Sequence, residues 1–429
     1  FFGKSTTAEN MMNKKLINLA VAAAMVAPAA AMADATLYGI LHQSIDYIDQ
    51  DDIVALDVDG QEIFIGDGFS GWSVNRADGA IIGSQTVGSV IRTPEGIELG
   101  RIADVRITNG PAGPSNRVGV KGSEDLGNGL KAVYQVEFGV TLSDRDFTAT
   151  NGDRGNGLNM RNSFVGLAGG FGTFLVGRHD TPFKISSGKL DMFADTMGDY
   201  NGALGFVDLR ADNTVTYISP SWSGFQFAGT VIPGGGATVE GGRSIDSDSL
   251  AEAYSLAAIY SNGPWYASAA YESLGSDMSR IGTLGNEEAD LAGLPDPFDD
   301  NTKWRIGLGI LDWNGFSLTG IYEDRSNQGF VDGWDNTSWQ VQAGYAFGNN
   351  MIKGSYGALD RDLDEFTRYE ASDGREILGV EPGGDLNQWT IAFDHNFSKR
   401  TKVYALYNQV DDDFLPDWDG FSLGLVHKF

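Results

Sequence analysis

The feature that most constrains this chain is a set of short segments in which apolar and polar side chains alternate strictly. Residues 130–142, 338–347 and 388–397 show the pattern most clearly, with an apolar side chain at every second position. A period of two is the period of a β-strand, whose side chains point alternately to the two faces of its sheet. The pattern therefore predicts an all-β protein whose sheet has one apolar and one polar face.

The segments are numerous and similar in length. A strand tilted by about 45° needs roughly 9–11 residues to cross a bilayer, and most of these segments are of that length. We expect about sixteen strands, near residues 35–48, 116–124, 130–143, 159–168, 172–180, 213–220, 224–232, 250–261, 265–274, 302–312, 315–325, 337–347, 350–361, 386–397, 400–411 and 419–429. After residue 33 no apolar run approaches the roughly 18 residues of a transmembrane helix.

The connections between the segments are short and long in turn. The short ones are Asp125–Gly129, Gly169–Gly172, Ser221–Gly224, Ser261–Pro264, Asp312–Gly315, Gly348–Asn350 and Phe397–Arg400. The long, acidic ones lie near 49–115, 144–158, 181–212, 233–249, 275–301, 326–336, 362–385 and 412–418. A soluble sandwich has no reason to sort its loops in this way, whereas a transmembrane antiparallel β-barrel has short periplasmic turns and long extracellular loops. The first long loop is unusually large.

The N-terminal region has the features of an export signal. Lys14 and Lys15 precede an apolar stretch, Leu16–Val26, and Ala31-Met32-Ala33 has the small residues of a cleavage site. We therefore interpret residues 12–33 as a signal peptide for the Sec pathway and residues 1–11 as an upstream extension. An N-terminal membrane anchor is the alternative. The barrel is then expected over residues 34–429.

Composition excludes several functions. The chain has 30 Lys and Arg against 58 Asp and Glu, a formal charge of −28, which would repel nucleic acid. It has no Cys and only four scattered His, so we expect neither a metal site nor a cofactor. No G-x-S-x-G, H-E-x-x-H, P-loop or dinucleotide-binding pattern is present, and we expect no enzymatic activity.

Five stretches carry a resemblance to a known family. They are Ala35–Gly39, Arg117–Gly127, Gly129–Gly139, Arg161–Arg178 followed by Asp180-Thr181-Pro182, and Gly424–Phe429. With them the chain resembles the Gram-negative general-diffusion porins of the Neisseria and Burkholderia type. The resemblance implies a sixteen-stranded outer-membrane barrel, a homotrimer, and a third long loop folded into the lumen. It also implies that the terminal Phe429 is the signal read by the barrel-assembly machinery.

By position, the third long loop is residues 181–212. Its apolar members, such as Phe193, Met197 and Phe206, would pin it against the inner wall. Its carboxylates would then face the channel and form the constriction: Asp191, Asp195, Asp199 and Asp208. An ordinary solvated surface loop is the alternative interpretation.

Basic residues fall on the polar side of the strands. A charge facing lipid at mid-bilayer costs roughly 2–4 kcal/mol, so these side chains should face the lumen. The predicted basic wall comprises Arg117, Lys121, Lys131, Arg161, Lys303, Arg305 and Lys353, with Arg178 added by the family resemblance. They would lie opposite the acidic loop and set up a field across the channel. Alternatively, some pair with lumen carboxylates such as Glu137 and Asp394 and only brace the wall.

The predicted function is a water-filled channel for passive diffusion of ions and small hydrophilic solutes. The alternatives are a substrate-specific porin and a surface adhesin or binding protein that the barrel anchors. The acidic loops should concentrate cations at the channel mouth, which predicts a mild cation preference. Lipopolysaccharide and outer-membrane lipid are the expected surroundings.

Overall fold

The computed structural model describes residues 35–50, 116–140, 142, 158–233, 250–275, 299–328, 333–363, 384–413 and 417–429, together with the backbone of short strands between them. The predicted signal peptide and the upstream extension lie outside the described residues, so both stay predictions. Among the described residues, no helix is long and apolar enough to cross a membrane.

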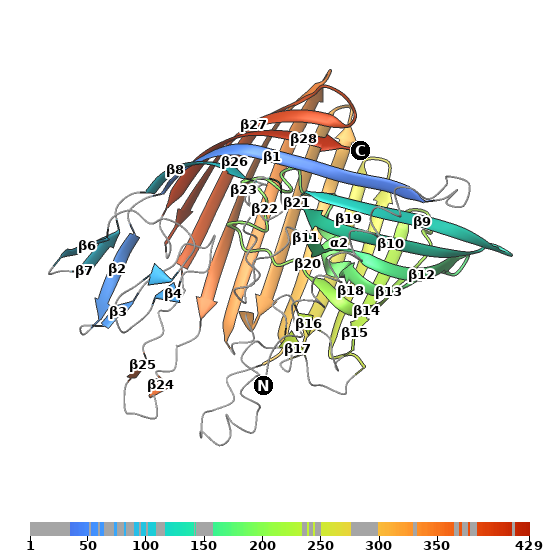
Figure 1. The fold of residues 1–429 in the computed structure, drawn as a ribbon, viewed down its shortest axis with the longest axis horizontal. Coiled ribbons are helices and arrows are strands. Elements are labelled where there is room, and N and C mark those ends of the chain that lie inside the picture. Colours follow the sequence, from blue (N-terminus) through green and yellow to red (C-terminus); the bar gives the residue numbers. More distant parts are fainter. Residues whose placement is uncertain are drawn as a thin grey trace, which may run out of the picture.

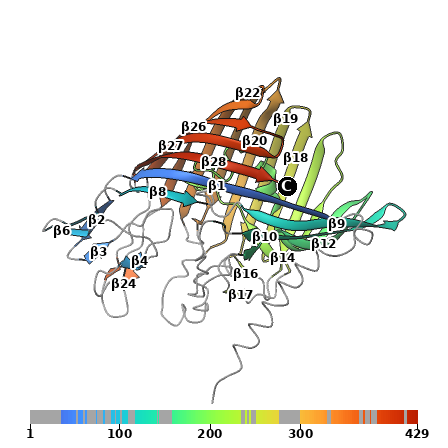
Figure 2. The same ribbon diagram turned by 45° about the horizontal axis from the view of Figure 1, so that its top comes forward.

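A single closed antiparallel sheet makes up most of the described chain (Figures 1 and 2). Fourteen of its positions are uninterrupted strands: β1 (Thr36–Gln50), β10 (Leu130–Val140), β13 (Gly172–Asp180), β14 (Arg210–Ile218), β15 (Phe225–Ile232), β18 (Ala253–Asn262), β19 (Trp265–Leu274), β20 (Asn301–Trp313), β21 (Phe316–Ser326), β22 (Trp334–Phe347), β23 (Asn350–Leu363), β26 (Gly384–Asn396), β27 (Thr401–Asp412) and β28 (Trp418–Lys428).

Two further strands of the barrel wall are each divided into two shorter strands. These are β8 (Ile102–Thr108) with β9 (Arg117–Gly127), and β11 (Leu158–Met160) with β12 (Ser163–Gly169). The wall is therefore the expected sixteen-stranded barrel. Apart from the wall, the long connections contain one small four-stranded sheet, in the order β3 (Gln61–Ile63), β2 (Ile53–Val58), β7 (Gly96–Leu99) and β6 (Val90–Thr93). They also contain three two-stranded sheets: β4 (Ser73–Val74) with β5 (Ile81–Ile82), β16 (Thr238–Val239) with β17 (Arg243–Ser244), and β24 (Tyr369–Glu370) with β25 (Glu376–Ile377).

The barrel closes along β1. On one side β1 pairs with β28 over Ile40–Gln50, and on the other it pairs with β9 and β8. The last residue completes the seam: the N–H of Phe429 donates to the carbonyl of Gly39 at 3.1 Å, and the N–H of Gly39 donates back at 3.0 Å. Closure leaves no unpaired sheet edge, which hydrocarbon would not tolerate.

The second strand of the barrel is longer than the sequence suggested. We expected the first long loop to run to residue 115, but β8 already returns to the wall and pairs with β1 over residues 102–108. That end of the loop was therefore wrong. Residues 102–108 alternate like the other strands, but a Gly- and Pro-containing run, 109–115, separates them from β9 and hides their continuity.

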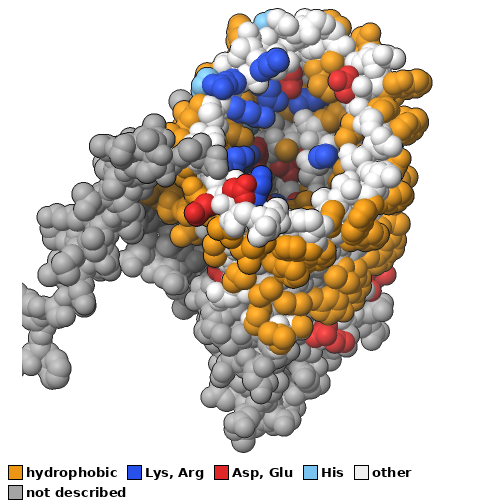
Figure 3. Space-filling model, turned by 90° about the vertical axis from the view of Figure 1, so that its right-hand side faces the viewer, with side chains coloured by type: hydrophobic (Ala, Val, Ile, Leu, Met, Phe, Trp, Pro, Cys, Tyr) orange, Lys and Arg blue, Asp and Glu red, His pale blue; other side chains and the backbone are white. Residues whose placement is uncertain are grey.

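The apolar face of the sheet points outward. On β20, Ile306 and Leu308 are 44% and 60% exposed, whereas Arg305 between its apolar neighbours is only 1% exposed. Figure 3 shows a broad hydrophobic belt around the outside and Lys, Arg, Asp and Glu side chains inside the opening. A soluble sandwich would bury the apolar face, so this arrangement confirms the transmembrane barrel.

Aromatic pairs lie on the outer face near the strand ends that meet the long loops. Trp304 packs against Tyr322, Trp339 against Tyr356 and Trp389 against Tyr407, with ring centroids 5.1, 5.6 and 5.2 Å apart. The three aromatic pairs come from three successive pairs of strands. Amphipathic rings at this height form the girdle that membrane barrels place at the bilayer interface.

The outward orientation of the apolar face predicts how the barrel responds to a charge placed on its lipid-facing side. Leu308→Arg should lower the free energy of unfolding in phospholipid vesicles by roughly 2–4 kcal/mol, because the guanidinium would lie near the bilayer midplane. Leu250→Arg is the matched control, since Leu250 is 75% exposed at the loop end of the barrel. There the cost should be about 0–1 kcal/mol. Equal urea midpoints for the two variants would contradict the lipid-facing assignment of Leu308.

Candidate functional site

The third loop leaves the wall at the end of β13 and runs to the start of β14. It begins with a short helix, α2 (Pro182–Ser187), and then continues without regular structure to Leu209. The N–H of Thr181 donates to the carbonyl of Leu209 at 3.0 Å, which ties the two ends of the loop together. We call residues 181–209 loop 3.

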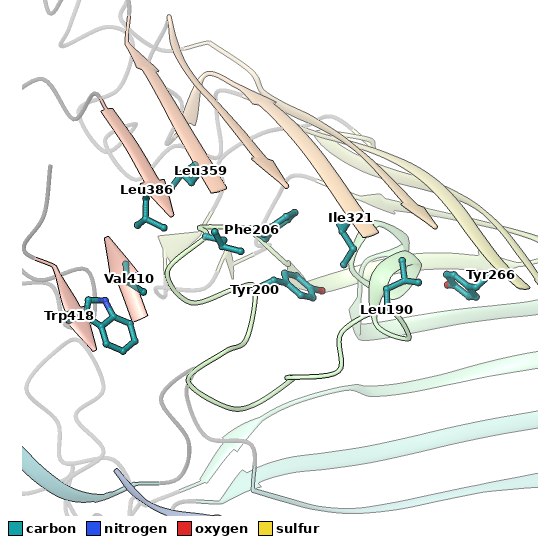
Figure 4. Packing of buried hydrophobic residues seen from close by; sticks show 10 residues of the cluster. Leu190, Tyr200, Phe206, Tyr266, Ile321, Leu359, Leu386, Val410 and Trp418 are labelled. Carbon is teal, nitrogen blue, oxygen red and sulfur yellow. The ribbon is translucent and has the colours of Figure 1, made fainter. Parts of the chain in front are cut away.

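Loop 3 lies inside the barrel, as the family resemblance implied. Its Leu190, Tyr200 and Phe206 pack into one buried cluster with inward side chains of the wall, among them Tyr266 and Ile321. Figure 4 shows these loop residues between side chains from widely separated strands. The expected role of Phe193, Met197 and Phe206 in pinning the loop is consistent with their burial at 0%, 3% and 2% exposure.

Glycines on the inner face of the wall make room for the loop. A Cβ on Gly307 or Gly309 of β20 would come within 2.3 or 2.7 Å of Leu190, and one on Gly357 of β23 within 2.6 Å of Leu204. Such distances are far inside van der Waals contact. The absence of side chains at these positions is therefore what lets loop 3 lie directly against the sheet.

Polar side chains of the wall satisfy the backbone of loop 3. The hydroxyl of Thr319 donates to the carbonyl of Leu190 at 2.8 Å, and the hydroxyl of Ser338 donates to that of Leu204 at 2.9 Å. The side-chain amide of Gln388 donates to the carbonyl of Met197 at 3.1 Å. An irregular segment buried without such partners would carry unpaired carbonyls, so the polar face of the barrel is a requirement for the loop's position.

Arg305 on β20 holds the loop most firmly. Its Nε donates to Glu323 at 2.7 Å and its Nη1 to Asp208 of the loop at 2.8 Å. Its guanidinium also lies over the ring of Phe183, 4.4 Å from the centroid. One buried cation thus joins the start of loop 3, its end and the wall.

Two lysines bind the loop in the same way. Lys303 donates to the carbonyl of Val207 at 2.8 Å and pairs with Glu272 at 2.9 Å. Lys353 donates to the carbonyl of Met192 at 2.6 Å and pairs with Asp394 at 3.2 Å. Both cations therefore neutralise wall carboxylates while they fix the loop.

These contacts correct part of the predicted basic wall. Lys303, Arg305 and Lys353 point inward, as the alternation predicted, but they are only 2%, 1% and 3% exposed. Loop 3 covers this half of the wall, so these three cations do not line the open channel. The alternative interpretation, in which wall cations pair with carboxylates and brace the structure, describes them better.

Two of the four loop carboxylates are also buried. Asp199 accepts the N–H groups of Asp195 and Asn201 at 2.7 and 2.8 Å, so it shapes the loop instead of facing the channel. Burial raises its pKa, and the neighbouring Asp191 adds to the shift. Asp208 is enclosed by Arg305 and Tyr200. The expectation that Asp199 and Asp208 face the channel is therefore corrected.

The charge of Asp208 is nevertheless retained. Burial acts to raise its pKa, but the positive charges of Arg305 and Lys184 outweigh burial, and the pKa of Asp208 is lowered. A carboxylate that stays ionised beside a buried guanidinium keeps the ion pair intact at neutral pH. The pair is consequently a permanent tie between loop and wall.

Asp191 and Asp195 are the more open carboxylates of loop 3. Asp191 is half-buried; it accepts the N–H of Phe193 at 2.8 Å and the amide of Gln342 at 3.1 Å, and burial raises its pKa to about 6. The side chain of Asp195 is 42% exposed and lies 4.0 Å from Arg117 on β9. Loop 3 thus reaches across the lumen to the opposite wall at Asp195.

The wall that loop 3 leaves uncovered carries the accessible cations. Arg117 is partly exposed, and Lys121 is exposed with its ammonium 5.0 Å from the ring centroid of Tyr38. Arg161 pairs with Glu137 at 2.7 Å. Lys131 is exposed near the short turn after β9. Among the described residues, neither Lys121 nor Lys131 forms an ion pair.

Arg178 does not belong to this wall. By the pairing register it shares a face with Phe174 and Val176, which are about half exposed on the outside of the barrel. There it pairs with Asp212 at 2.6 Å. The resemblance placed Arg178 in the lumen, but the alternation along β13 turns it outward, so that placement is corrected.

Some inward cations escaped the sequence analysis. Lys402 on β27 is partly exposed and lies 3.0 Å from Asp394, and Lys189 of loop 3 is exposed. The alternation of residues 400–411 puts Lys402 on the same face as Asn408 and could have identified it. Within the described part of the chain, no group of His, Asp and Glu has the arrangement of a metal site.

Comparisons with known proteins agree with this architecture. The sequence model of the Gram-negative porin family matches residues 20–415. The major outer membrane protein P.IB of Neisseria gonorrhoeae is 26% identical over 399 residues, which cover 91% of this chain and 92% of the relative. The P.IA protein of Neisseria meningitidis serogroup C is 28% identical over 340 residues, which cover 73% of this chain and 82% of the relative.

Solved porins have the same fold. An anion-selective porin from Comamonas acidovorans superposes with a TM-score of 0.57 at 18% identity, covering 92% of this chain and 99% of that one. The trimer form of OmpT from Vibrio cholerae superposes with a TM-score of 0.53 at 14% identity, covering 92% of this chain and 99% of that one. The chain belongs to the Gram-negative porin family: it is an outer-membrane β-barrel that forms a diffusion channel, and it is not an enzyme.

Proposed function

We propose that loop 3 is the constriction of this channel, and that ions and small hydrophilic solutes pass between the loop and the uncovered wall of β9, β10 and β12. The observation that carries the proposal is the attachment of the loop through Arg305 to Asp208 and Glu323, whose side chains are 0%, 6% and 0% exposed. A loop held by a buried ion pair keeps its position against the flow of solvent. The gap beside it then sets which solutes pass.

We further propose that the narrow zone favours anions. Of the four loop carboxylates, Asp199 is buried, the side chain of Asp208 is 6% exposed, and Asp195 lies beside the cation of Arg117. Lys121 on the facing wall remains exposed and has no carboxylate partner among the described residues. Local charge therefore differs in sign from the net charge of −28, from which we expected a mild cation preference.

The assembly of the channel follows from its family. We infer that three copies associate, since the related Vibrio protein has a trimer form. We also propose that residues 12–33 direct export and that Phe429 is the signal for the barrel-assembly machinery; its place at the seam with Gly39 supports a role in closing the barrel. A particle the mass of one chain on native electrophoresis would refute the trimer.

Two other functions remain distinguishable by experiment. Liposome swelling with sugars of increasing size should show a rate that falls smoothly with solute size and does not saturate. Saturable uptake would instead indicate a substrate-specific porin, and absence of uptake would indicate a barrel that only anchors a surface adhesin.

The role of Arg305 in holding the constriction predicts the behaviour of Arg305→Met. The change removes the buried guanidinium that pairs with Asp208, and it leaves Glu323 with Arg325 at 3.4 Å as its remaining cation. Removing one partner of a buried ion pair typically costs about 3–5 kcal/mol. Loop 3 should detach for part of the time, so single-channel current should be larger and noisier than in the wild type. Arg361→Met is the matched control: Arg361 is an inward arginine that pairs with Asp412 through two bonds of 2.7 Å, at the strand ends away from Asp208. If both variants conduct like the wild type, Arg305 does not hold the constriction.

The proposed anion preference is tested by reversing one charge. Lys121→Glu should shift the reversal potential in a KCl gradient toward that of a cation-selective channel, because it replaces an unpaired cation on the uncovered wall. Lys399→Glu makes the same change of charge in an exposed short turn and should leave the reversal potential close to the wild-type value. A cation-selective wild type would overturn the proposal directly.

The raised pKa of Asp191 predicts a pH dependence of loop 3. The pKa rises from an ordinary 3.8 to about 6, so the protonated form is favoured in the folded state. The resulting stabilisation is complete below about pH 4 and is lost as pH rises through about 6. Asp191→Asn should therefore reduce the change in open-channel noise across this range. Asp195→Asn, which alters an exposed carboxylate of the same loop, should shift the pH dependence only slightly, because the charge of Asp195 contributes least to the raised pKa of Asp191.

A further inference from the structure

The two edges of β1 lack the constraint that fixes the register of most strand pairs in this wall. Neighbouring strands that are joined by a short turn are held in register by that turn. β28 and β1 are the last and first strands of the wall, so no turn joins them, and β1 reaches β8 and β9 only through the largest connection. Alternation excludes a slip of one residue, which would turn apolar side chains inward, but it allows a slip of two. Side-chain contacts are therefore needed to select the register.

At each of the three strand pairs around the seam, an aromatic ring lies opposite a glycine. The pairs are Tyr404 with Gly424 between β27 and β28, Phe429 with Gly39 between the end of β28 and β1, and Tyr38 with Gly119 between β1 and β9. A Cβ on these glycines would come within 2.1, 2.4 and 2.7 Å of the ring. Among the other described glycines, only Gly169 would bring a Cβ closer than 3.0 Å to a ring, and that ring, Phe171, belongs to the same turn. Each of the three rings thus occupies the space that a side chain would need.

Tyr404 of β27 reaches across β28 to β1. Its ring lies over Gly424, and its hydroxyl forms a hydrogen bond of 2.8 Å with Nε2 of His42. The rings of Tyr404 and His42 meet edge to face, with centroids 5.6 Å apart. Both side chains are buried on the inner face of the wall. A residue of β27 therefore holds β28 against β1 from the inside.

Tyr38 spans the neighbouring strand on the other side of β1. Gly119 of β9 lies opposite Tyr38, and Glu137 of β10 lies opposite Gly119. The hydroxyl of Tyr38 donates to Glu137 at 2.8 Å, so the ring extends across β9. Glu137 is held in turn by Arg161 at 2.7 Å. The two tyrosines thus join β1 to both of its neighbours and to the strands beyond them.

Phe429 covers the seam from the outside. Gly39 shares the outward face of β1 with Leu37 and Leu41, which are 50% and 37% exposed, but Gly39 itself is buried. The ring of Phe429 lies over it, and the backbones of the two residues exchange two hydrogen bonds. A slip of two residues would place this ring opposite Leu37 or Leu41 instead of a glycine. Of these three registers, only the native one leaves space for the ring.

We propose that these three contacts between a ring and a glycine form a closure lock, which selects the register in which the barrel closes. With the seam shifted by two residues, Tyr404 loses its bond to His42, and Phe429 meets a leucine. With the other edge of β1 shifted by two, Tyr38 lies opposite a charged side chain instead of a glycine. Phe429 therefore acts in the finished wall, apart from its proposed role as an assembly signal. The closure lock belongs to the wall and is independent of how the channel selects solutes.

The register can be measured with cysteine pairs across the seam, because the chain has no cysteine of its own. Ile45→Cys with Leu423→Cys reports the native register, in which these residues are paired, and Ile45→Cys with Leu425→Cys reports a slip of two. Directly paired residues are within reach of a disulfide, whereas diagonal ones are too far apart. The full chain is refolded from urea into phospholipid vesicles without the assembly machinery, oxidised, and analysed by electrophoresis. With the closure lock intact, only the native pair should cross-link.

Removal of the inner rings should loosen the register. Tyr38→Leu with Tyr404→Leu should raise the yield of the slipped cross-link about tenfold over the wild type, because two ring contacts are lost. The matched control is Gly320→Ala with Gly354→Ala. At these glycines a Cβ would meet nothing closer than 3.9 and 3.4 Å, so the wild-type pattern should persist. A ring-free variant that gives only the native cross-link, at the wild-type yield, would overturn the proposal.

A second comparison tests whether each glycine serves its ring. Gly424→Ala should lower the yield of native cross-link in the wild-type background, because the new Cβ would displace the ring of Tyr404. In the Tyr404→Leu background the same change should have little effect, since no ring then occupies that space. If Gly424→Ala is equally harmful in both backgrounds, the glycine acts for another reason and the closure lock is refuted. Tyr404→Leu alone adds no clash, so it supplies the measurement if Gly424→Ala prevents folding.

Discussion

The structure depends on one constraint: inside hydrocarbon, every backbone N–H and C=O must find a partner within the protein. A sheet meets this requirement only when it closes. Here closure falls to β1, which pairs with β28 on one side and with β8 and β9 on the other, and to the two hydrogen bonds between Gly39 and Phe429. Once the wall is closed, its apolar face must turn toward lipid, and the polar face is left to surround water.

A polar interior in turn allows an irregular segment to lie inside a membrane protein. Loop 3 has carbonyls and carboxylates that lipid would not accept, but the inner face supplies hydroxyl, amide and ammonium donors for them, such as Ser338, Gln388 and Lys353. The wall and the loop therefore satisfy each other. Charged side chains that are paired and buried between loop 3 and the wall are no longer exposed to solutes. For this reason not every inward-facing residue lines the channel.

The sequence predicted the wall well and the site only in part, for a clear physical reason. Which face a strand residue occupies is a local property of alternation, so Lys121 and Arg305 were both placed correctly on the inner side. Whether such a residue meets water depends on where loop 3 lies, which is decided by contacts between residues about a hundred positions apart, as for Asp208 and Arg305. Arg178 failed differently: family resemblance assigned it inward, and the alternation, which is the better guide within a strand, turns it outward. One signal for the covered half was present but not used, because Gly307 and Gly309 on the polar face of β20 mark where the loop approaches.

The distribution of charge also determines how the net charge should be interpreted. Most acidic residues of this chain belong to long connections other than loop 3, and membrane barrels have their long connections outside a hydrophobic belt about 25 Å tall. At physiological salt the Debye length is about 8 Å, so charges at the mouth are largely screened at that depth. In the constriction that we propose, the potential then comes from the few groups that remain both near and in water, and at the described positions these are mainly Lys121, Arg117 and Asp195. Under this proposal a strongly acidic protein contains a basic passage, because burial and distance decide which of its charges a passing ion encounters.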